Sequence, residues 1–324
     1  MRKVMIYGTL GPACAEPATL ADMFREGMDG VRLNLSHTTL DGAKDLLDAY
    51  RTAARIAKKQ PLLLIDMQGP ELRIGALESP LSLRAGDRIE TGAIPFPDAV
   101  TDLLTDGQTV LLDDGKLLLK AENGGLFVLR GGMLESRKSV ALPGRSIPTP
   151  AMTDADKKHI EQAAAYGVTA VMQPFVRSRE DLIEVRSALN RAGAQHVRLF
   201  AKIENAAGVE KLDELIPHCD EIVIARGDLG NAMPLWELPA VQKRIAAACR
   251  AAGRDFTVVT QMLDSMTHRP VPTRAEVNDI FNAVLDGAAS VMVTSETAAG
   301  DYPALAIRYL ANTVREAEAF LQKQ

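Results

Sequence analysis

Short apolar runs alternate with helix-like segments along almost the whole chain, and this alternation constrains the fold more than any other feature. The runs lack the in-out polar pattern of a half-exposed strand, which is typical of strands buried on both faces of a parallel sheet. The predicted strands are 4–8, 30–35, 62–66, 169–173, 197–203, 221–225, 256–260 and 290–294.

A helical pattern follows each of these strands. Thr153 before Asp154 and Asp156, and Thr273 before Glu276, are helix start signals. Eight strand–helix units in series predict a (β/α)8 TIM barrel, with a doubly wound open sheet as the alternative. We prefer the barrel because it gathers the polar residues at the strand ends onto one face. The predicted helices are 18–26, 41–58, 154–166, 179–191, 208–216, 238–252, 274–285 and 303–321.

The third unit is interrupted by a different pattern. Segments 81–87, 109–115 and 126–132 resemble short strands that end in Asp-Gly or Gly-Gly turns. We therefore predict a small all-β domain at 74–142, inserted after the third strand of a catalytic barrel formed by 1–73 and 143–324. An insert at this point emerges on the face where barrel active sites lie, so it is placed to act as a lid.

Composition excludes several classes of protein. The net charge of −5 gives no general basic surface for nucleic acid. The chain has no apolar run of 18 residues, so we expect no membrane span. Three cysteines without a C-x-x-C pair argue against a disulfide framework or a zinc site and fit the cytoplasm.

Charged residues adjoin the ends of two predicted strands. Lys202 and Glu204 close one strand, and Asp228 follows the next one. Two carboxylates can hold one divalent cation, and a lysine beside them can neutralise a transferring phosphoryl group. Because unpaired charge next to buried strands is costly, these three residues predict a site for an anionic, oxygen-rich substrate.

Eight motifs in this order resemble the pyruvate kinase family, over nearly the whole chain. They are TLGPA at 9–13, VRLNLSH at 31–37, QGPELR at 68–73, KIEN at 202–205, ARGDLG at 225–230, TQMLDSM at 260–266, PTRAE at 272–276 and SETA at 295–298. The resemblance implies a barrel with a lid after the third strand. It also implies transfer of a phosphoryl group from phosphoenolpyruvate to ADP, which yields pyruvate and ATP.

The resemblance also implies a role for each matching residue. Glu204 and Asp228 would bind Mg²⁺ or Mn²⁺, and Lys202 would stabilise the phosphoryl group during transfer. The amides of Gly227 and Asp228, with the Thr260 hydroxyl, would hold the substrate carboxylate. The remaining assignments are Arg32 and Arg73 for phosphates, Arg32, His37 and Lys138 for the nucleotide, Thr260 and Glu296 for proton delivery, and Asn34, Ser36, Asp66 and Met67 for K⁺.

The chain also departs from the family pattern. It ends after the eighth predicted helix, where most members carry a further domain with an effector site, and its lid is shorter. We therefore expect a form without that regulation and allow a homodimer through the barrel rather than the usual tetramer. Pro174 stands where Ser is usual, and Glu71 matches the potassium-dependent members whereas Met67 and Gln68 do not.

Three alternatives remain at this point. A related phosphotransferase could act on another enol or hydroxy acid. A metal-dependent lyase or aldolase of the wider phosphoenolpyruvate-binding barrels would share the carboxylate pair but would not need Lys138 and a nucleotide lid. A non-catalytic metabolite-binding protein is a further alternative, although buried charges without a task are expensive.

Overall fold

A closed barrel of eight parallel strands forms the body of the molecule in the computed structural model, which describes residues 3–113, 115–145, 147 and 149–323. The strands follow the order β1-β15-β14-β13-β12-β11-β3-β2, and the pairing of β1 with β15 closes the ring. This closure confirms the predicted barrel and rules out the open sheet. The strands are β1 (Met5–Thr9), β2 (Gly30–Asn34), β3 (Leu62–Asp66), β11 (Ala170–Gln173), β12 (Arg198–Ile203), β13 (Glu221–Ala225), β14 (Asp255–Val259) and β15 (Ser290–Met292).

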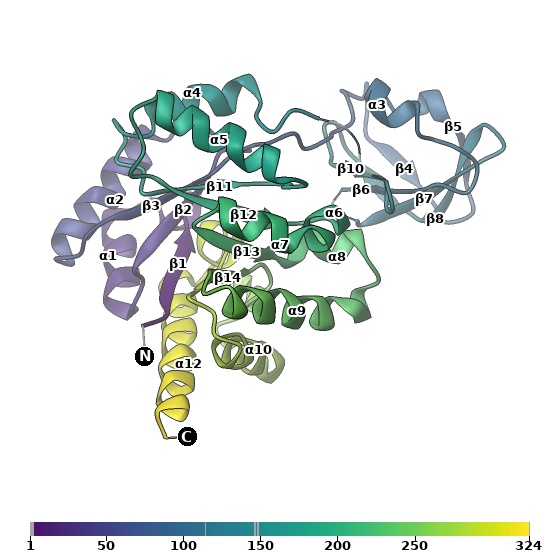
Figure 1. The fold of residues 1–324 in the computed structure, drawn as a ribbon. Coiled ribbons are helices and arrows are strands. Elements are labelled where there is room, and N and C mark those ends of the chain that lie inside the picture. Colours follow the sequence, from purple (N-terminus) through teal and green to yellow (C-terminus); the bar gives the residue numbers. More distant parts are fainter. Residues whose placement is uncertain (1–2, 114, 146, 148, 324) are drawn as a thin grey trace.

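Helices surround the barrel, and most begin and end within a few residues of the predicted bounds (Figure 1). The predicted helix 208–216 was wrong as one piece, because two short helices with a break at Lys211 replace it. Two more short helices, α8 and α11, were not predicted. The helices are α1 (Pro17–Glu26), α2 (Lys44–Ile56), α4 (Asp154–Gln162), α5 (Arg179–Arg191), α6 (Ala206–Glu210), α7 (Leu212–Leu215), α8 (Arg226–Ala232), α9 (Leu238–Ala251), α10 (Arg274–Leu285), α11 (Ser295–Ala298) and α12 (Pro303–Gln322).

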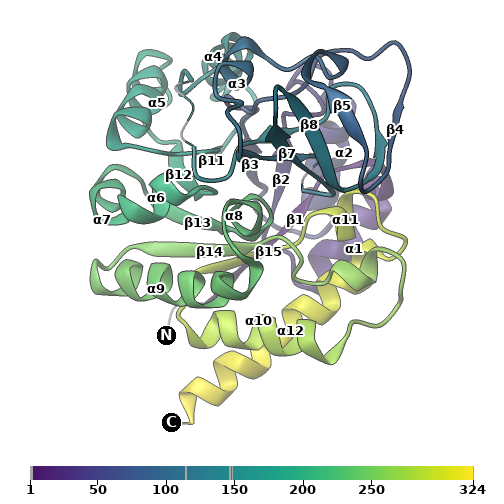
Figure 2. The ribbon, with the colours of Figure 1, turned by 90° about the vertical axis from the view of Figure 1, so that its right-hand side faces the viewer.

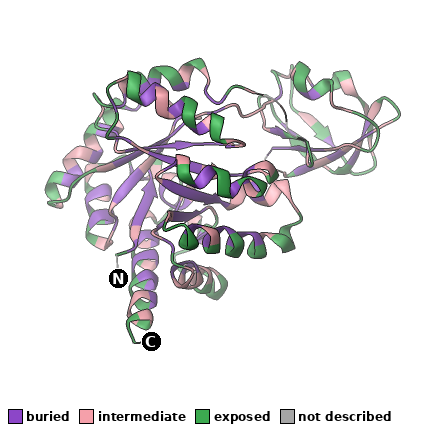
Figure 3. Cartoon of the chain, in the orientation of Figure 1, coloured by how far each residue is buried: buried purple, intermediate pink, exposed green. Residues whose placement is uncertain are grey.

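Two apolar layers stabilise the barrel. The larger lies between the strands and the helices, and a smaller one fills the barrel interior with side chains such as Leu64, Phe200, Val223 and Met292. The strands are therefore buried on both faces (Figure 3). This double burial explains why they appear in the sequence as continuous apolar runs.

A small β domain follows β3 and projects from the barrel on the side away from both chain termini (Figures 1 and 2). It has its own core, whose buried residues run from Ile74 to Leu142, and we propose 74–142 as the bounds of this lid. One sheet has the order β10-β6-β7-β8-β5, and β4 pairs with β9. The elements are β4 (Leu81–Leu83), β5 (Arg88–Glu90), α3 (Asp98–Thr101), β6 (Thr109–Leu112), β7 (Leu117–Glu122), β8 (Gly125–Arg130), β9 (Gly132–Leu134) and β10 (Val140–Ala141).

The fully buried carboxylate of Asp156 fixes the segment that leads from β3 into the lid. It accepts hydrogen bonds from the amides of Gln68 (2.9 Å), Gly69 (3.1 Å) and Thr153 (2.8 Å). Gly69 has a φ of +62°, and a Cβ there would lie 2.3 Å from the Pro174 ring, so only glycine fits. Asp156 therefore caps α4 and anchors the lid hinge at the same time.

We expect the substitution Asp156→Ala to lower the free energy of unfolding by about 3 kcal/mol, because it removes a helix cap and leaves the part-buried amide of Gln68 and the buried amide of Gly69 without this acceptor. Urea unfolding measures this loss. Asp154→Ala in the same helix turn is the control and should change stability by about 0.5 kcal/mol or less, since that side chain is exposed. Equal effects of the two substitutions would contradict the anchoring role of Asp156.

Candidate active site at the carboxyl ends of the strands

Side chains two residues apart on a strand point to the same face of the sheet. Charged residues that follow an interior apolar residue by two positions therefore lie at the top of the barrel interior. On β12, Phe200 lies in the interior layer, and Lys202, two residues later, points to the same side. On β3, Leu64 and Asp66 are related in the same way. Arg32 comes from the neighbouring strand β2, beside Leu64 in the strand register. Residues from three strands thus meet at one rim.

Lys202 lies between two carboxylates. Its Nζ atom is 3.2 Å from each oxygen of Asp66 and 2.9 Å from Oε1 of Glu204. Arg32 Nε donates to Asp66 Oδ2 at 2.7 Å. The exposed fractions of the side chains are 13% for Lys202, 2% for Asp66 and 1% for Glu204, so this network is almost dry. Each charge has an opposite neighbour, which a buried ionic cluster requires.

The pKa values follow from these contacts. Burial alone would raise the pKa of Asp66, but the charges of Lys202 and Arg32 outweigh it and hold the pKa below the usual range. Burial alone would lower the pKa of Lys202, yet the carboxylates of Asp66 and Glu204 raise it well above its ordinary value. Lys202 therefore stays a cation at any physiological pH, and a fixed positive charge is what a transferring phosphoryl group needs.

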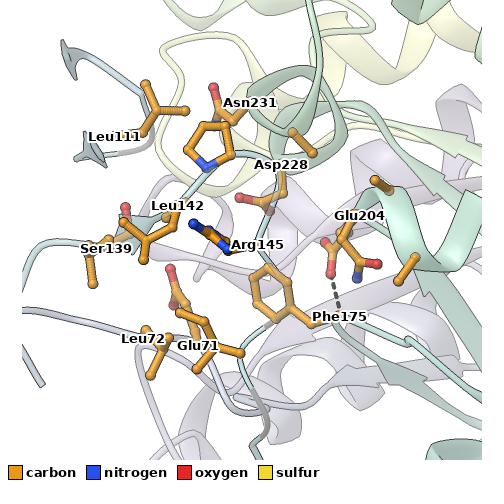
Figure 4. A pocket seen from close by; sticks show the side chains of 18 of the residues that line it. Glu71, Leu72, Leu111, Ser139, Leu142, Arg145, Phe175, Glu204, Asp228 and Asn231 are labelled. Carbon is orange, nitrogen blue, oxygen red and sulfur yellow. Dashed lines mark hydrogen bonds between the residues drawn. The ribbon is translucent and has the colours of Figure 1, made fainter. Parts of the chain in front are cut away.

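Glu204 and Asp228 line one cavity of about 380 Å³ between the barrel and the lid (Figure 4). The amide of Phe175 donates to Glu204 Oε2 at 2.8 Å and fixes that carboxylate. Within the described residues, no three His, Cys, Asp or Glu side chains gather closely enough to hold a metal by themselves. Mg²⁺ often uses one or two carboxylates and takes its other ligands from water and substrate, so this pair fits that ion.

The start of α8 brings Gly227 and Asp228 next to Thr260, which follows β14. A Cβ on Gly227 would lie 3.1 Å from Thr260 Cγ2, so the two residues pack closely. Thr260 has a φ of +78°, and Gln261 after it has +55°. A left-handed conformation is strained for a β-branched residue and is characteristic of functional sites.

Glu296 is fully buried and supports the backbone. Its Oε1 accepts from the amide of Leu263 (3.0 Å), and its Oε2 accepts from the amide of Thr294 (2.6 Å). Both carboxylate oxygens are thus engaged with two loops at the rim. The structure gives Glu296 a role in fixing those loops.

The residues expected to bind K⁺ lie at the ends of β2 and β3. Asn34 Oδ1 accepts from the amide of Ser36 at 3.1 Å. Asp66 contacts Lys202 and Arg32, and Met67 is buried directly after it, with its amide bonded to the carbonyl of Met172. Asn34 and Asp66 are partners in the register of β2 and β3, whereas the Met67 side chain belongs to the core between strands and helices.

Of the residues expected at the nucleotide, Arg32 belongs to the Lys202 cluster, whereas Lys138 has other partners, and so does Arg73, which is expected to hold phosphates. Arg73 pairs with Glu71 (2.6 Å) and donates to the carbonyl of Arg137 in the lid (3.0 Å). Lys138 forms ion pairs with Asp113 (3.1 Å) and Glu135 (3.4 Å), and these two carboxylates raise its pKa. His37 is exposed at the rim.

Sequence reasoning assigned Asp66 to the predicted K⁺ site but missed its bridge between Arg32 and Lys202, which only the closed barrel reveals because the strands are far apart in the sequence. It also missed two further contributors. Phe175 fixes Glu204 through its backbone, which leaves no signature in side-chain type. Arg226 reaches back to the loop after β14, and its position beside Asp228 in the ARGDLG motif was the available signal.

The fold and this site define a (β/α)8-barrel protein with a cluster of buried charges at the carboxyl ends of its strands, beneath an inserted β domain. Residues 1–307 match the family described as pyruvate kinase, barrel domain, and the chain belongs to the pyruvate kinase family. It is 38% identical to a pyruvate kinase of Methylorubrum extorquens over 94% of this chain and 66% of that relative. Identity is 36% to a pyruvate kinase of Aeropyrum pernix, over 95% and 69%, and 34% to pyruvate kinase 1 of Saccharomyces cerevisiae, over 98% and 68%.

The chain spans only part of the length of its curated relatives, 66% of one and 58% of another. The matched region holds the barrel, the lid and the whole charged cluster.

We expect Lys202→Met to lower the free energy of unfolding by about 3 to 5 kcal/mol, because two buried carboxylates lose their shared cation. Thermal and urea unfolding measure this loss. Adding Glu204→Gln to the variant should restore part of the stability, since Glu204 has then lost its cation, whereas Asp66 keeps its pair with Arg32. Lys243→Met, which breaks a pair whose lysine is 53% exposed, should cost about 1 kcal/mol or less. Equal losses at the two lysines would contradict the burial argument.

Proposed function

We propose that this protein is a phosphotransferase of the pyruvate kinase type, which moves a phosphoryl group from phosphoenolpyruvate to ADP and releases pyruvate and ATP. The observation that carries the proposal is the dry cluster in which Lys202 lies between Asp66 and Glu204, beside Arg32. Family membership supports the same reaction. Phosphoryl transfer depends mainly on positioning and charge stabilisation, and this cluster supplies both.

Lys202 and Arg32 act on the phosphoryl group in this proposal. The ammonium of Lys202 is held by Asp66 and Glu204 on one side and offers its remaining direction to the oxygens in transfer. Arg32 is oriented by Asp66 and donates to Thr9 Oγ1 at 3.4 Å. Because its guanidinium has further donors, it can bind a phosphate oxygen without leaving Asp66.

Glu204 and Asp228 hold Mg²⁺ or Mn²⁺ in this proposal. The ion would offset negative charge on the phosphate and enolate oxygens. Glu204 is already fixed by the amide of Phe175, so the carboxylate loses little freedom when a cation binds. The amides at the start of α8, on Gly227 and Asp228, together with the Thr260 hydroxyl, bind the carboxylate of the substrate.

The proposed proton transfer to the enolate takes place beside Thr260. The buried Glu296 positions Thr294 and Leu263 at the rim, so it supports this step through the loops that it fixes. In this proposal K⁺ adds a further positive charge to the site. It binds near Asn34, Ser36, Asp66 and Met67.

The lid completes the nucleotide site when it closes. Lys138 is held by Asp113 and Glu135, and Arg73 is held by Glu71. The phosphates of ADP or ATP, with His37 at the rim, would compete for these cations. Closure also excludes water from the cleft, which strengthens every charge interaction inside it.

We also propose that the protein works in the cytoplasm. The three cysteines are free and buried, which fits a reducing cytoplasm. None of the helices that the structure describes combines the length and the apolar composition that a membrane span needs. A homodimer through the barrel is the assembly that we propose.

We expect pyruvate to form from phosphoenolpyruvate and ADP in the presence of Mg²⁺ and to stop when the metal is chelated, because Glu204 and Asp228 cannot neutralise the phosphate themselves. A coupled assay of pyruvate measures both states, with and without K⁺. Restoration by added Mg²⁺ is the control. A folded, metal-binding protein that makes no pyruvate would contradict the proposal, and turnover of another phosphorylated acid would favour the related phosphotransferase.

We expect Lys202→Met to lower kcat by a factor on the order of 10³, as for other single electrostatic groups, in protein that is folded at the assay temperature. Lys243→Met, far from the cleft on α9, is the matched control and should keep the activity of the unchanged chain. Near-normal turnover by the Lys202 variant would contradict the assignment of this lysine.

A further inference from the structure

Two consecutive residues that are not glycine hold left-handed backbone conformations at the edge of the proposed carboxylate site. Thr260 has a φ of +78° and Gln261 a φ of +55°. Thr260 is β-branched, for which this region is a genuine outlier. Such a conformation persists only when surrounding contacts hold it in place.

Arg226 supplies those contacts from the first residue of α8. Its Nε donates to the Thr260 carbonyl at 3.1 Å, and its Nη2 donates to the same oxygen at 2.7 Å. Its Nη1 forms an ion pair with Asp279 Oδ2 on α10 at 2.5 Å. The side chain of Arg226 is only 10% exposed, compared with 33% for Asp279. A planar fork that binds one carbonyl twice and a carboxylate once has little freedom to turn.

The backbone next to this clamp is the part of the site that the substrate would contact. Gly227 follows Arg226 directly, and a Cβ on it would lie 3.1 Å from Thr260 Cγ2 and 3.7 Å from Thr260 Oγ1. The start of α8 and the Thr260 side chain therefore pack so closely that a side chain on Gly227 would press against Thr260. Arg226 joins these two segments, which come from different strands.

We propose that Arg226, anchored by Asp279, is a positioning residue that holds Thr260 in register with the amides of Gly227 and Asp228, so that the three groups bind the substrate carboxylate together. This inference rests on the proposed function. Arg226 acts through Thr260, and the guanidinium itself has its donors directed to the Thr260 carbonyl, Met262 Sδ and Asp279. Loss of the clamp therefore weakens carboxylate binding more than it affects the nucleotide.

Arg186 offers a matched comparison at the other end of the barrel. Its Nη1 donates to the carbonyl of Val197, just before β12 (2.9 Å), and its Nη2 contacts the carboxylate of Asp220. This is also a guanidinium between a strand carbonyl and a carboxylate, but it lies at the amino end of the strand. Substitution of either arginine would lower the stability of the barrel, whereas only substitution of Arg226 would weaken binding of the substrate carboxylate.

The test compares Arg226→Gln, Arg226→Lys, Asp279→Asn and Arg186→Gln with the unchanged chain. Steady-state kinetics give separate KM values for phosphoenolpyruvate and ADP, and calorimetry gives the affinity for oxalate, a planar dicarboxylate, in the presence of Mg²⁺. We expect Arg226→Gln to raise the KM for phosphoenolpyruvate and the Kd for oxalate about tenfold, the scale of one charge-assisted hydrogen bond. The KM for ADP should change less than about twofold on the same scale.

Arg226→Lys and Asp279→Asn should give smaller shifts in the same direction, because each keeps part of the clamp, and they remain informative if the glutamine variant folds poorly. Arg186→Gln should lower stability without changing either KM. An unchanged KM for phosphoenolpyruvate and unchanged oxalate affinity in the Arg226 variants would overturn the inference, and so would equal losses for both substrates. Failure of the unchanged chain to turn over phosphoenolpyruvate or bind oxalate would instead overturn the proposed function, and this inference with it.

Discussion

The carboxylate of Asp66 is the interaction on which the rest of the site depends. It is buried at the end of β3 and contacts Arg32 from β2 and Lys202 from β12. Two cations this close to the top of an apolar barrel would repel each other without an anion between them. Asp66 therefore allows both positive charges to lie together at the top of the barrel, and Glu204 is the second carboxylate beside Lys202.

The lid is placed by a second buried carboxylate. Asp156 belongs to the barrel, since it caps α4, yet it accepts from the backbone of Gln68 and Gly69, where the chain leaves β3 for the lid. The path into the lid is therefore fixed, while the cations at its edge, Lys138 and Arg73, are held by exchangeable ion pairs. Both cations lie at the base of the lid, since Arg73 bridges to Ser139 and the amide of Ile74 donates to the carbonyl of Lys138.

The sequence predicted the barrel well because the period of the βα pattern is a local property. Runs such as 62–66 and 221–225 match the observed strands, since burial on both faces leaves a continuous apolar signal. The break at Lys211 and the short helices α8 and α11 were not visible, because they depend on close packing. At Gly208, for example, a Cβ would lie 2.8 Å from the carbonyl of Val176. Tertiary contacts of this kind override a helical pattern.

The residues of the site also divide into those that local sequence predicts and those that depend on tertiary contacts. Lys202, Glu204 and Asp228 were predicted from residue type and strand ends alone, because a charged side chain beside a buried strand is costly unless it has a partner or a function. The ARGDLG motif was a signal for Arg226 itself, but the clamp that it makes could not be predicted, because a hydrogen bond to a backbone carbonyl has no signature in residue type. The left-handed backbone of Thr260 could not be predicted either, since a β-branched residue such as threonine favours extended backbone. The side-chain types of this site therefore indicate its chemistry. The relative positions of its groups depend on backbone geometry, which is visible only in the folded chain.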